Sequence, residues 1–406
     1  MDVSMGKLVA KSLPEVFVAL QLANNIPANT TAKNFVFIKI NLGFYRRANY
    51  YYVIYRAHKV LLKSLIMYLR CMQNTLVSIL TPFKNTEAYL ADCINSILQQ
   101  TYTNWELIII DDASTDESYK IVHAFAENDT RIKLFKNTGS GIIDALQLAF
   151  KHSKGNFLTR MDSDDVMLPN KLEVLVQNLM DSGEKHVAIG LVAYFSETGV
   201  GDGYKSYETW LNNLTKTGNN YDEIYKECVI PSPCWMVYRT DFIACDAFNP
   251  DLYPEDYDLT FRFYKNHYTC IPCDLVLHKW RDYSTRTSRT HIHYAQNHFT
   301  ALKLHHFLNI DYNPEKTLTI WGAGTKGKIM AKILLEKNIP FEWICDNPKK
   351  IGKDIYGKTL LEFKALSKLK NSQSIITVAN KLAQKEIRTY LKSLKLEPVK
   401  DYVFFC

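Results

Sequence analysis

The chain has 406 residues, of which 47% are hydrophobic and 22% charged, and its net charge is +7. These values are typical of an ordinary folded soluble protein, and the length predicts two or three domains. Two classes of protein are excluded, because no basic block has the length or interleaved aromatic residues of a nucleic-acid-binding segment and no run of about 18 apolar residues predicts a membrane span.

The cysteines and the start of the chain indicate a cytoplasmic protein. The nine cysteines are scattered and odd in number, which favours a reducing compartment over a disulfide framework. Cys270 and Cys273 form a single CxxC in an apolar run, so we expect them to pack within a strand. No secretory signal pattern opens the chain. The modest positive charge suits anionic substrates such as nucleotide diphosphates, although a solvated lysine-rich surface explains it more simply.

Residues 1–73 are predicted to form an extension before the first domain. Within it, Val53–Arg70 mixes leucine and isoleucine with lysine and arginine, a pattern typical of a basic amphipathic helix. Such a helix would give peripheral contact with the inner face of a membrane. The alternatives are a segment with little structure of its own, or an upstream start that is not the natural one, with the first domain starting at Met72.

From Thr75 onward, short apolar runs alternate with segments in which apolar residues recur at helical spacing. In chain order we expect strand Leu76–Thr81, helix Glu87–Gln100, strand Trp105–Ile110, helix Ser118–Asn128, strand Ile132–Phe135, helix Gly141–His152 and strand Phe157–Met161. This alternation predicts an α/β fold with a doubly wound sheet over residues 74–310, whose ligands bind beyond the carboxyl ends of the strands.

Acidic residues follow two of these strands. Phe157–Met161 runs directly into Asp162, Ser163, Asp164 and Asp165. Because neighbouring carboxylates repel one another, such a cluster favours a bound cation, and hard oxygen ligands suit Mg²⁺ or Mn²⁺. A capping role for Asp165 before the next helix is the alternative.

The other strand ends in Asp111 and Asp112, followed by a turn-rich run. A carboxylate here can accept the ring N–H of a pyrimidine, while Ser114 or Asp116 caps the helix that follows. The same loop can serve both roles, nucleotide-base binding and helix capping.

Glu255 and Asp256 precede an amphipathic helix. A positioned carboxylate can remove the proton of an acceptor hydroxyl, which is a poor nucleophile at neutral pH. On spacing alone, a capping aspartate with acidic residues in the first helical turn explains the pair better, because such residues interact favourably with the helix dipole.

A second, smaller α/β unit is predicted over residues 315–406, after a connecting helix, Tyr294–Phe307. Its expected elements are strand Leu318–Trp321, helix Lys328–Lys337, strand Phe341–Cys345 and strand Ser374–Ala379. Gly322, Gly324 and Gly327 follow the first of these strands, and Asp346 ends a later one, which is the context of a dinucleotide-binding fingerprint. The unit has about half the strands of a complete dinucleotide-binding fold, so a packing or assembly role is the alternative.

Five motifs occur in a characteristic order between Thr75 and Arg289. They are Val77–Asn85, Ser96–Tyr102, Trp105–Asp116, Arg160–Asp165 and Glu255–Leu259. In this order and at these separations they resemble the motifs of family 2 glycosyltransferases of the GT-A fold. The C-terminal unit resembles small Rossmann-like modules appended to some members.

The resemblance implies a role for each matching residue. The donor would be bound by Thr81, Pro82, Asn85, Asp111, Asp112, Asp162, Arg160, Arg281 and Arg289. Asp164 would bind the metal directly with Asp162 beside it, and Asp256 would be the general base, with Glu255 the less favoured candidate. Many members carry a histidine near the position of Arg281, whereas Asp282 follows here, which puts in question the contact that closes over the donor.

The resemblance further implies a metal-dependent, inverting glycosyltransferase. Its donor would be a nucleotide-diphosphate sugar, most often a UDP-sugar, and its acceptor a saccharide or lipid-linked hydroxyl in the synthesis of surface polysaccharide or lipopolysaccharide. One alternative is a nucleotidyltransferase, which should carry a glycine- and lysine-rich loop after the first strand, unlike Thr81–Asn85. A non-catalytic protein that binds nucleotide sugars is the other.

Overall fold

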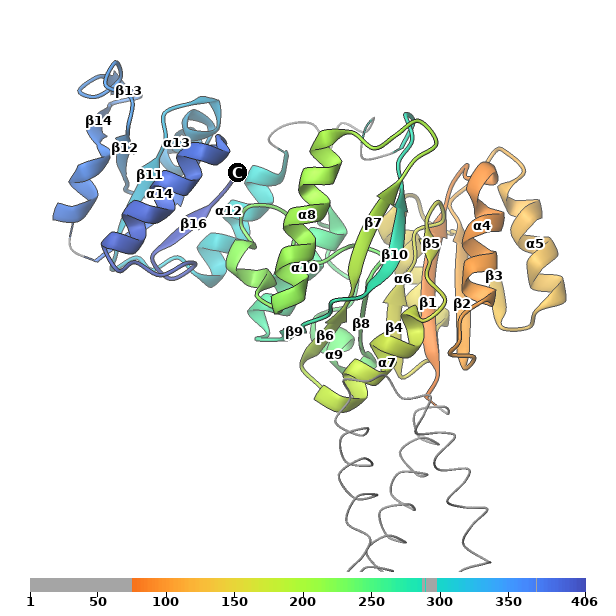
Figure 1. Cartoon of the computed structure of the whole chain (residues 1–406). Coiled ribbons are helices and arrows are strands. Elements are labelled where there is room, and N and C mark those ends of the chain that lie inside the picture. Colours follow the sequence, from red (N-terminus) through yellow and green to blue (C-terminus); the bar gives the residue numbers. More distant parts are fainter. Residues whose placement is uncertain (1–74, 287–288, 290–297, 370) are drawn as a thin grey trace, which may run out of the picture. The chain divides into compact units, whose positions relative to one another are not determined.

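The computed structural model of the chain describes residues 75–286, 289, 298–369 and 371–406 (Figure 1). The predictions for residues 1–73, including the helix Val53–Arg70, lie outside these ranges. Leu76–Cys406 forms one compact unit. Within the described ranges, no helix is both long and apolar enough to cross a membrane.

The first part of this unit is built around a seven-stranded sheet and a three-stranded sheet. Its elements are, in chain order, β1 (Val77–Phe83), α4 (Glu87–Leu98), β2 (Trp105–Asp111), α5 (Ser118–Asn128), β3 (Ile132–Lys136), α6 (Ile142–His152), β4 (Phe157–Arg160), β5 (Val166–Met167), α7 (Lys171–Ser182), β6 (His186–Ile189), β7 (Leu191–Phe195), α8 (Asp202–Thr217), η1 (Asn220–Glu223), β8 (Trp235–Tyr238), α9 (Arg239–Ala244), α10 (Glu255–Lys265), β9 (Thr269–Ile271), β10 (Val276–Arg281) and α12 (His298–Ile310). All seven strands and helices expected between Leu76 and Met161 are present, with bounds shifted by one or two residues.

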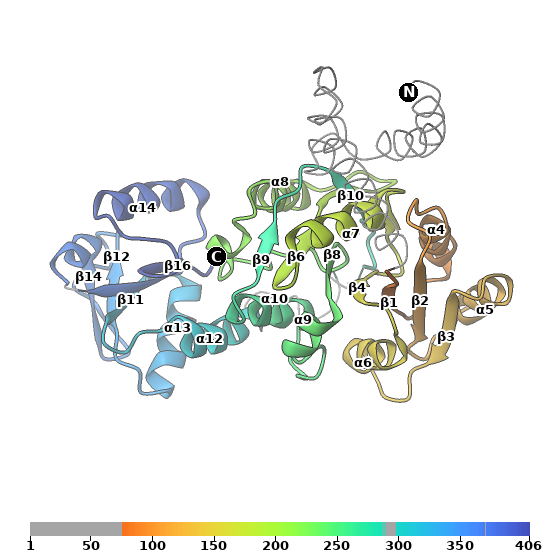
Figure 2. The same cartoon turned by 90° about the horizontal axis from the view of Figure 1, so that it is seen from below.

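The seven-stranded sheet has the order β3-β2-β1-β4-β8-β6-β9. Strands β1 to β4 are parallel, whereas β8 runs antiparallel to both of its neighbours. Every residue of β1 and β2 is buried, as expected for apolar runs covered on both faces. Figure 2 shows α4 and α7 on one face of the sheet and α6 and α9 on the other. The carboxyl ends of β1, β2 and β4 therefore meet at one edge.

The three-stranded sheet, β5-β10-β7, joins that edge to the later part of the sequence. In it β10 pairs with β5 antiparallel and with β7 parallel. Since β5 begins just after the acidic cluster, this pairing brings residues 276–281 beside it.

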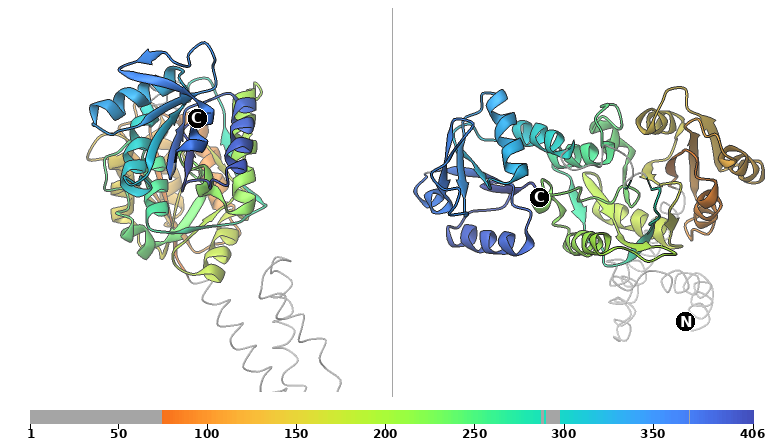
Figure 3. Two further views of the ribbon diagram at one scale, coloured as in Figure 1. Left: turned by 90° about the vertical axis from the view of Figure 1, so that its left-hand side faces the viewer. Right: turned by 90° about the horizontal axis from the view of Figure 1, so that it is seen from above.

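The C-terminal part contains a six-stranded sheet. Its elements are β11 (Thr317–Trp321), α13 (Thr325–Glu336), β12 (Glu342–Cys345), β13 (Asp354–Ile355), β14 (Lys358–Glu362), η3 (Phe363–Lys368), β15 (Ser372–Ile376), α14 (Lys381–Ser393) and β16 (Tyr402–Phe404). The strand order is β13-β14-β12-β11-β15-β16, parallel except for β13. Figures 2 and 3 show α13 and α14 on opposite faces of this sheet.

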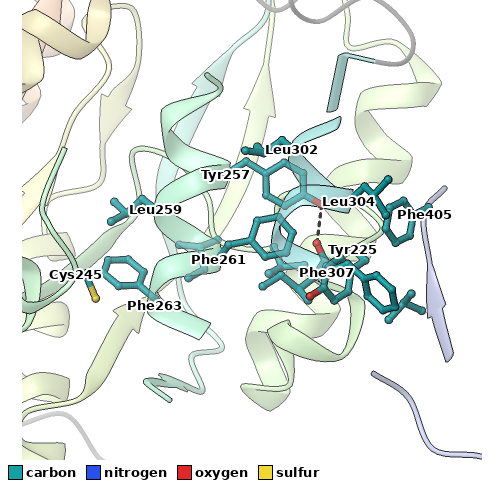
Figure 4. Close-up of a cluster of buried hydrophobic side chains, with 14 of the residues drawn as sticks. Tyr225, Cys245, Tyr257, Leu259, Phe261, Phe263, Leu302, Leu304, Phe307 and Phe405 are labelled. Atoms are coloured by element: carbon teal, nitrogen blue, oxygen red, sulfur yellow. Dashed lines mark hydrogen bonds between the residues drawn. The ribbon is translucent and has the colours of Figure 1, made fainter. Parts of the chain in front are cut away.

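An aromatic cluster connects the two parts (Figure 4). The ring of Phe405, which follows β16, stacks on Tyr225 with centroids 5.6 Å apart and meets Phe307 of α12 edge-on. The hydroxyl groups of Tyr225 and Tyr264 both donate to Asp311, at 2.6 and 2.9 Å. Burial of large aromatic side chains is strongly stabilising, so the six-stranded sheet is held against the first part by a continuous core.

Candidate active site

The acidic residues predicted from the sequence gather at the carboxyl edge of the seven-stranded sheet. Asp112 follows β2 and Asp162 follows β4, and both strands are neighbours of β1. The main-chain N–H of Asp112 donates to Phe83 O, and that of Met161 to Leu80 O. The two acidic loops are thus fixed by the same central strand.

Asp112 is buried and lies among hydrogen-bond donors. Its Oδ1 accepts from Asn137 Nδ2 at 2.7 Å and from the main-chain N–H of Gly141 at 3.0 Å. Lys84 Nζ lies 3.5 Å from its Oδ2. These donors orient the carboxylate at the end of β2.

The loop after β1 is held by the turn after β2. Asn85 has a φ of 50° and accepts through its side-chain oxygen from the N–H of Thr115 at 2.8 Å. Asp111 Oδ1 accepts from the N–H of Ser114 at 2.9 Å. Thr81, in β1, has a buried hydroxyl with no hydrogen-bond partner among the described residues. Pro82 and Asp111, at the carboxyl ends of β1 and β2, and Asn85 and Asp112, in the loops that follow, therefore belong to one connected region.

Asp116 lies just before the N-cap residue of α5, Glu117, whose side chain makes no capping hydrogen bond. Asp116 Oδ1 accepts from the N–H of Ser118, the first residue of α5, at 3.0 Å. Ser114 instead accepts from the N–H of Asn85, so it links the two loops rather than capping the helix.

Arg160 joins the acidic cluster to the Glu255–Asp256 pair. Its Nε donates to Asp162 Oδ1 at 2.9 Å and its Nη1 to Glu255 Oε1 at 2.7 Å. The buried guanidinium has its pKa lowered by burial and raised more strongly by Asp162, Glu255 and Asp256, for a net increase. Removing one partner of such a buried pair is strongly destabilising, by about 3–5 kcal/mol. Residues that are 95 positions apart are thereby brought to one site.

Asp164 lies beside aromatic and basic residues from the segment after β10. Its Oδ2 accepts from the hydroxyl of Tyr283 at 2.9 Å, and its main-chain oxygen accepts from Arg281 Nε at 2.9 Å. Burial, followed by the charge of Asp165, raises the pKa of Asp164 to about 7, although Arg286 opposes this shift. A carboxylate pKa raised in this way is typical of a site that gains from a nearby cation.

Asp165 does not cap a helix, so that alternative is wrong. It is fully buried, its Oδ1 accepts from the N–H of Arg281 at 2.8 Å, and its Oδ2 lies 3.0 Å from His278 Nε2. The helix α7 begins six residues later, at Lys171, with Asn170 before it. Asp165 instead anchors β10 to the acidic loop.

Asp256 occupies the first turn of α10. Its Oδ1 accepts from the N–H of Tyr257 at 2.8 Å, so it also serves the helix start. Burial, followed by the charge of Glu255, raises the pKa of Asp256 to about 7, and Asp162 adds to the increase. A carboxylate with such a pKa suits proton transfer near neutral pH.

Arg281 and Arg289, which together with Arg160 were predicted to bind the donor, have different surroundings. Arg281 contacts Asp92 Oδ2 at 2.9 Å as well as the main chain of Asp164. Arg289 forms a bidentate pair with Asp282, with both distances at 2.8 Å. Arg286, which the sequence did not single out, is the arginine whose charge lowers the pKa of Asp164 and Asp165. Nothing in the sequence around Arg286 distinguishes it from Arg281 or Arg289 as the arginine whose charge acts on the acidic cluster.

The glycine-rich run of the C-terminal part has the predicted context. It follows β11 and precedes α13, which begins at Thr325, three residues earlier than expected. Gly322 has a φ of 116°, a conformation that favours glycine. Asp346 follows β12 and is exposed.

Asp162 and Asp164 supply hard oxygen donors of the kind that Mg²⁺ or Mn²⁺ prefers, and the pKa of Asp164 is raised first by burial and then by the charge of Asp165. In the described part of the chain, no group of three or more histidine, cysteine or acidic side chains is arranged to hold a metal ion.

Residues 78–245 match the model of the family described as glycosyl transferase family 2. The Escherichia coli protein named UDP-Glc:alpha-D-GlcNAc-diphosphoundecaprenol beta-1,3-glucosyltransferase WfgD is 31% identical over 220 residues, which are 52% of this chain and 78% of that protein. An uncharacterized glycosyltransferase of Haemophilus influenzae is 30% identical over 285 residues, 64% of this chain and 85% of the relative. Glycosyltransferase GlyG of Streptococcus pneumoniae is 36% identical, over 41% of its own length.

Solved structures also resemble this chain. S. aureus TarS in complex with UDP-GlcNAc has 19% identity and a TM-score of 0.47, over 59% of this chain and 68% of that one. The mannosyltransferase PcManGT from Pyrobaculum calidifontis, in complex with GDP-Man and Mn²⁺, has 19% identity and a TM-score of 0.41, over 60% of this chain and 70% of that one. From the sequence relatives and the strand order of its first sheet, the chain belongs to the family 2 glycosyltransferases of the GT-A fold and is an enzyme that transfers a sugar from a nucleotide-sugar donor.

Proposed function

We propose that the chain transfers a sugar from a UDP-sugar to a hydroxyl group of a lipid-linked saccharide, with inversion at the anomeric carbon. The donor and acceptor classes are those in the name of the E. coli relative, which the chain covers over 78% of its length. Such an acceptor would bring the protein to the inner face of a membrane in surface polysaccharide synthesis.

The observation that carries this proposal is the bridge formed by Arg160. It places Asp162 and Glu255 on one guanidinium and so holds the acidic loop opposite the first turn of α10. Donor-side and acceptor-side carboxylates then face one reaction centre.

Asp256 is the general base in this proposal. Its pKa of about 7 lets it accept the proton of the acceptor hydroxyl as the oxygen attacks the anomeric carbon. Glu255 is less suited, because its Oε1 is already bound to Arg160. A single displacement assisted by one base gives inversion.

Asp112, with Asn85 and Pro82 beside it, would bind the nucleotide base, and Asp162 and Asp164 would lie at the diphosphate. A divalent cation held by Asp162 and Asp164 would neutralise the charge that develops on the departing nucleoside diphosphate. Arg281 donates to the main-chain oxygen of Asp164, and the charge of Arg286 lowers the pKa of Asp164, so both arginines would help to hold the phosphates.

Thermal stabilisation by a panel of nucleotide sugars, with Mn²⁺ and then with EDTA, tests the proposal. We expect a UDP-sugar to stabilise the protein in Mn²⁺ and to lose its effect in EDTA. Asp164→Asn should weaken this binding by about tenfold to a hundredfold, since it removes a charged ligand.

Asp251→Asn is the matched control, because this exposed residue lies near Glu255 in the sequence and should leave donor binding unchanged. The proposal would be wrong if no nucleotide sugar stabilised the protein, or if Asp164→Asn bound the donor in Mn²⁺ as tightly as the unchanged chain.

A further inference from the structure

A second polar site lies outside the acidic one, between α8 and α14. It is a pocket of about 1340 Å³, here called the basic pocket. Its cationic side chains are Lys205, Lys226, Lys303, Lys326, Lys381, Lys385 and Arg388. Two carboxylates, Asp202 and Glu227, line it as well. The excess of positive charge predicts an anionic ligand.

Most of these cations lack a carboxylate partner. Arg388 and Lys226 share Glu223, at 2.6 and 3.8 Å. Within the described part of the chain, no ion pair joins Lys303, Lys326, Lys381 or Lys385 to an acidic side chain. The positive charge on this surface is therefore largely uncompensated.

Lys303 gives the most specific indication, because it is buried. Its Nζ donates to two main-chain oxygens, Lys226 O at 3.2 Å and Phe405 O at 2.9 Å. Burial lowers the pKa of Lys303 to about 8, against the opposing charge of Glu227. The Nζ of Lys303 also lies 5.5 Å from the ring centroid of Phe405. Even with these partners a buried ammonium group is costly, and an approaching anion would lower that cost.

The basic pocket borders the place where a parallel sheet binds ligands. In the six-stranded sheet the chain passes from β11 to β12 on one side, and β15 and β16 lie on the other. Lys326 lies in the first turn of α13 and Lys381 begins α14, so both stand beyond the carboxyl ends of these central strands. Helices α13 and α14 cover opposite faces of the sheet (Figure 3). This is the topological switch point at which open α/β sheets bind their ligands.

The wall of the basic pocket is also connected to the proposed base. Tyr207, which lines the pocket, donates through its hydroxyl to Cys228 O at 2.9 Å. The Sγ of Cys228 lies 3.6 Å from Thr260 Oγ1, which donates to Asp256 O at 2.8 Å. Three consecutive contacts thus separate the pocket from Asp256.

We propose that the basic pocket binds the diphosphate group of the lipid-linked acceptor, so that the six-stranded sheet takes part in acceptor recognition. This inference rests on the proposed function, which supplies the acceptor class. Lysine is a common binder of phosphate oxygens, and four of these lysines form no ion pair with a carboxylate among the described residues. The volume exceeds that of a typical small-molecule site, so a diphosphate and an attached sugar fit together.

Calorimetric titration of the full chain tests this site, with UDP and Mn²⁺ present to fill the donor site. The first probe is N-acetylglucosamine joined through a diphosphate to a short prenyl chain, and the second is the same sugar on an alkyl chain without phosphate. In the double variant Lys381→Ala/Lys385→Ala, we expect the dissociation constant of the diphosphate probe to rise on the order of tenfold or more, relative to that of the phosphate-free probe. Both lysines are exposed, so the fold should be preserved.

The matched control is Lys392→Ala/Lys395→Ala, which removes the same charge from exposed positions at the end of α14 and just after it. It should bind both probes as the unchanged chain does. Equal affinity of the Lys381→Ala/Lys385→Ala protein and the control for the diphosphate probe would overturn the inference.

ADP and NADH, added as competitors, separate the two sources of a diphosphate. Failure of both to displace the diphosphate probe supports the acceptor as the ligand. If either nucleotide binds the pocket in a lysine-dependent manner and the acceptor probe does not, the site belongs to a nucleotide and our assignment is wrong. Because the titration needs no turnover, a protein that transfers no sugar would refute the proposed function without changing the binding result.

Discussion

The two large sheets of this protein carry opposite charges at their carboxyl edges. The seven-stranded sheet ends in Asp112, Asp162 and Asp164, whereas the helices after the central strands of the six-stranded sheet carry Lys326 and Lys381. Both edges follow the rule that ligands bind beyond the carboxyl ends of parallel strands. The order in which the strands are connected therefore determines the position of each candidate site, and the residues that follow the strands determine the charge of the ligand that it favours.

The two edges also differ in how their charges are balanced. At the acidic edge, Arg160 is buried between Asp162 and Glu255, and Arg281 and Arg286 approach Asp164. At the basic edge, Lys303 is buried against main-chain oxygens. A substitution at the acidic edge is thus expected to act on catalysis or on donor binding, and one at the basic edge on acceptor binding.

Asp256→Asn is the strongest test of this division. An asparagine keeps the size of the side chain but cannot accept a proton, so we expect turnover to fall on the order of a thousandfold. Donor binding, which depends on the other carboxylates, should be retained. Steady-state transfer rates and donor titration on the same preparation measure the two effects.

The control for this substitution is Asp258→Asn, which alters a carboxylate bound to Arg262 and His306 instead. It is expected to lower stability, with the remaining folded enzyme retaining its rate. If Asp256→Asn turned over substrate as fast as the unchanged chain, another residue would be the general base, and Glu255 would be the first candidate.

Much of the acidic edge could be predicted from the sequence because it is local. Apolar runs predicted the buried strands β1, β2 and β4, and the carboxylates at their ends follow directly in the chain. Partners distant in sequence were not predictable. Arg160 meets Glu255, at the start of α10, 95 positions later, and Asp165 meets His278 113 positions later beside the pairing of β5 with β10. No short pattern encodes either contact.

The basic edge was harder still. The glycine-rich run and its strand could be recognised, but the basic pocket is assembled from α8, α12 and α14, which lie far apart in the chain. Lysines on exposed helices look alike in a sequence. Burial of Lys303 distinguishes it, and that burial depends on the packing of Phe405.

Two glycines in the C-terminal part provide a smaller, structural test. A Cβ added at Gly327 would lie 2.0 Å from Gly322 O, whereas one added at Gly324 would meet nothing within 4 Å. We therefore expect Gly327→Ala to destabilise the protein by about 1–3 kcal/mol through overpacking, and Gly324→Ala to have little effect. Denaturant unfolding of the two variants measures the difference.

The site at the seven-stranded sheet should keep its donor affinity in both glycine variants, as long as the protein is folded. Equal stability of the two would contradict the close approach of α13 to the loop after β11. Loss of donor binding in Gly327→Ala below its unfolding transition would show that the two edges are less independent than their separate sheets indicate.

The smallest expected effect is a pH dependence in which the two edges titrate in opposite senses. Asp256, with Glu255, Arg160 and Asp162 around it, has its pKa raised to about 7, so the ionised base is lost as the pH falls through that value. Lys303, near Glu227, has its pKa lowered to about 8, so its charge is lost as the pH rises further. The value of kcat/KM for a diphosphate acceptor should fall up to tenfold per pH unit on the acid side and more gently on the alkaline side.

An acceptor without phosphate separates the two limbs of this profile. It needs the base but has no diphosphate for Lys303 to bind, so its kcat/KM should keep the acid limb and lose the alkaline one. The comparison requires the pH series to be run with both acceptors at saturating donor, because kcat/KM then reports the groups that titrate before the acceptor binds. If the alkaline limb had the same size for both acceptors, Lys303 would not take part in binding the acceptor. The acid limb would still report the ionisation of Asp256.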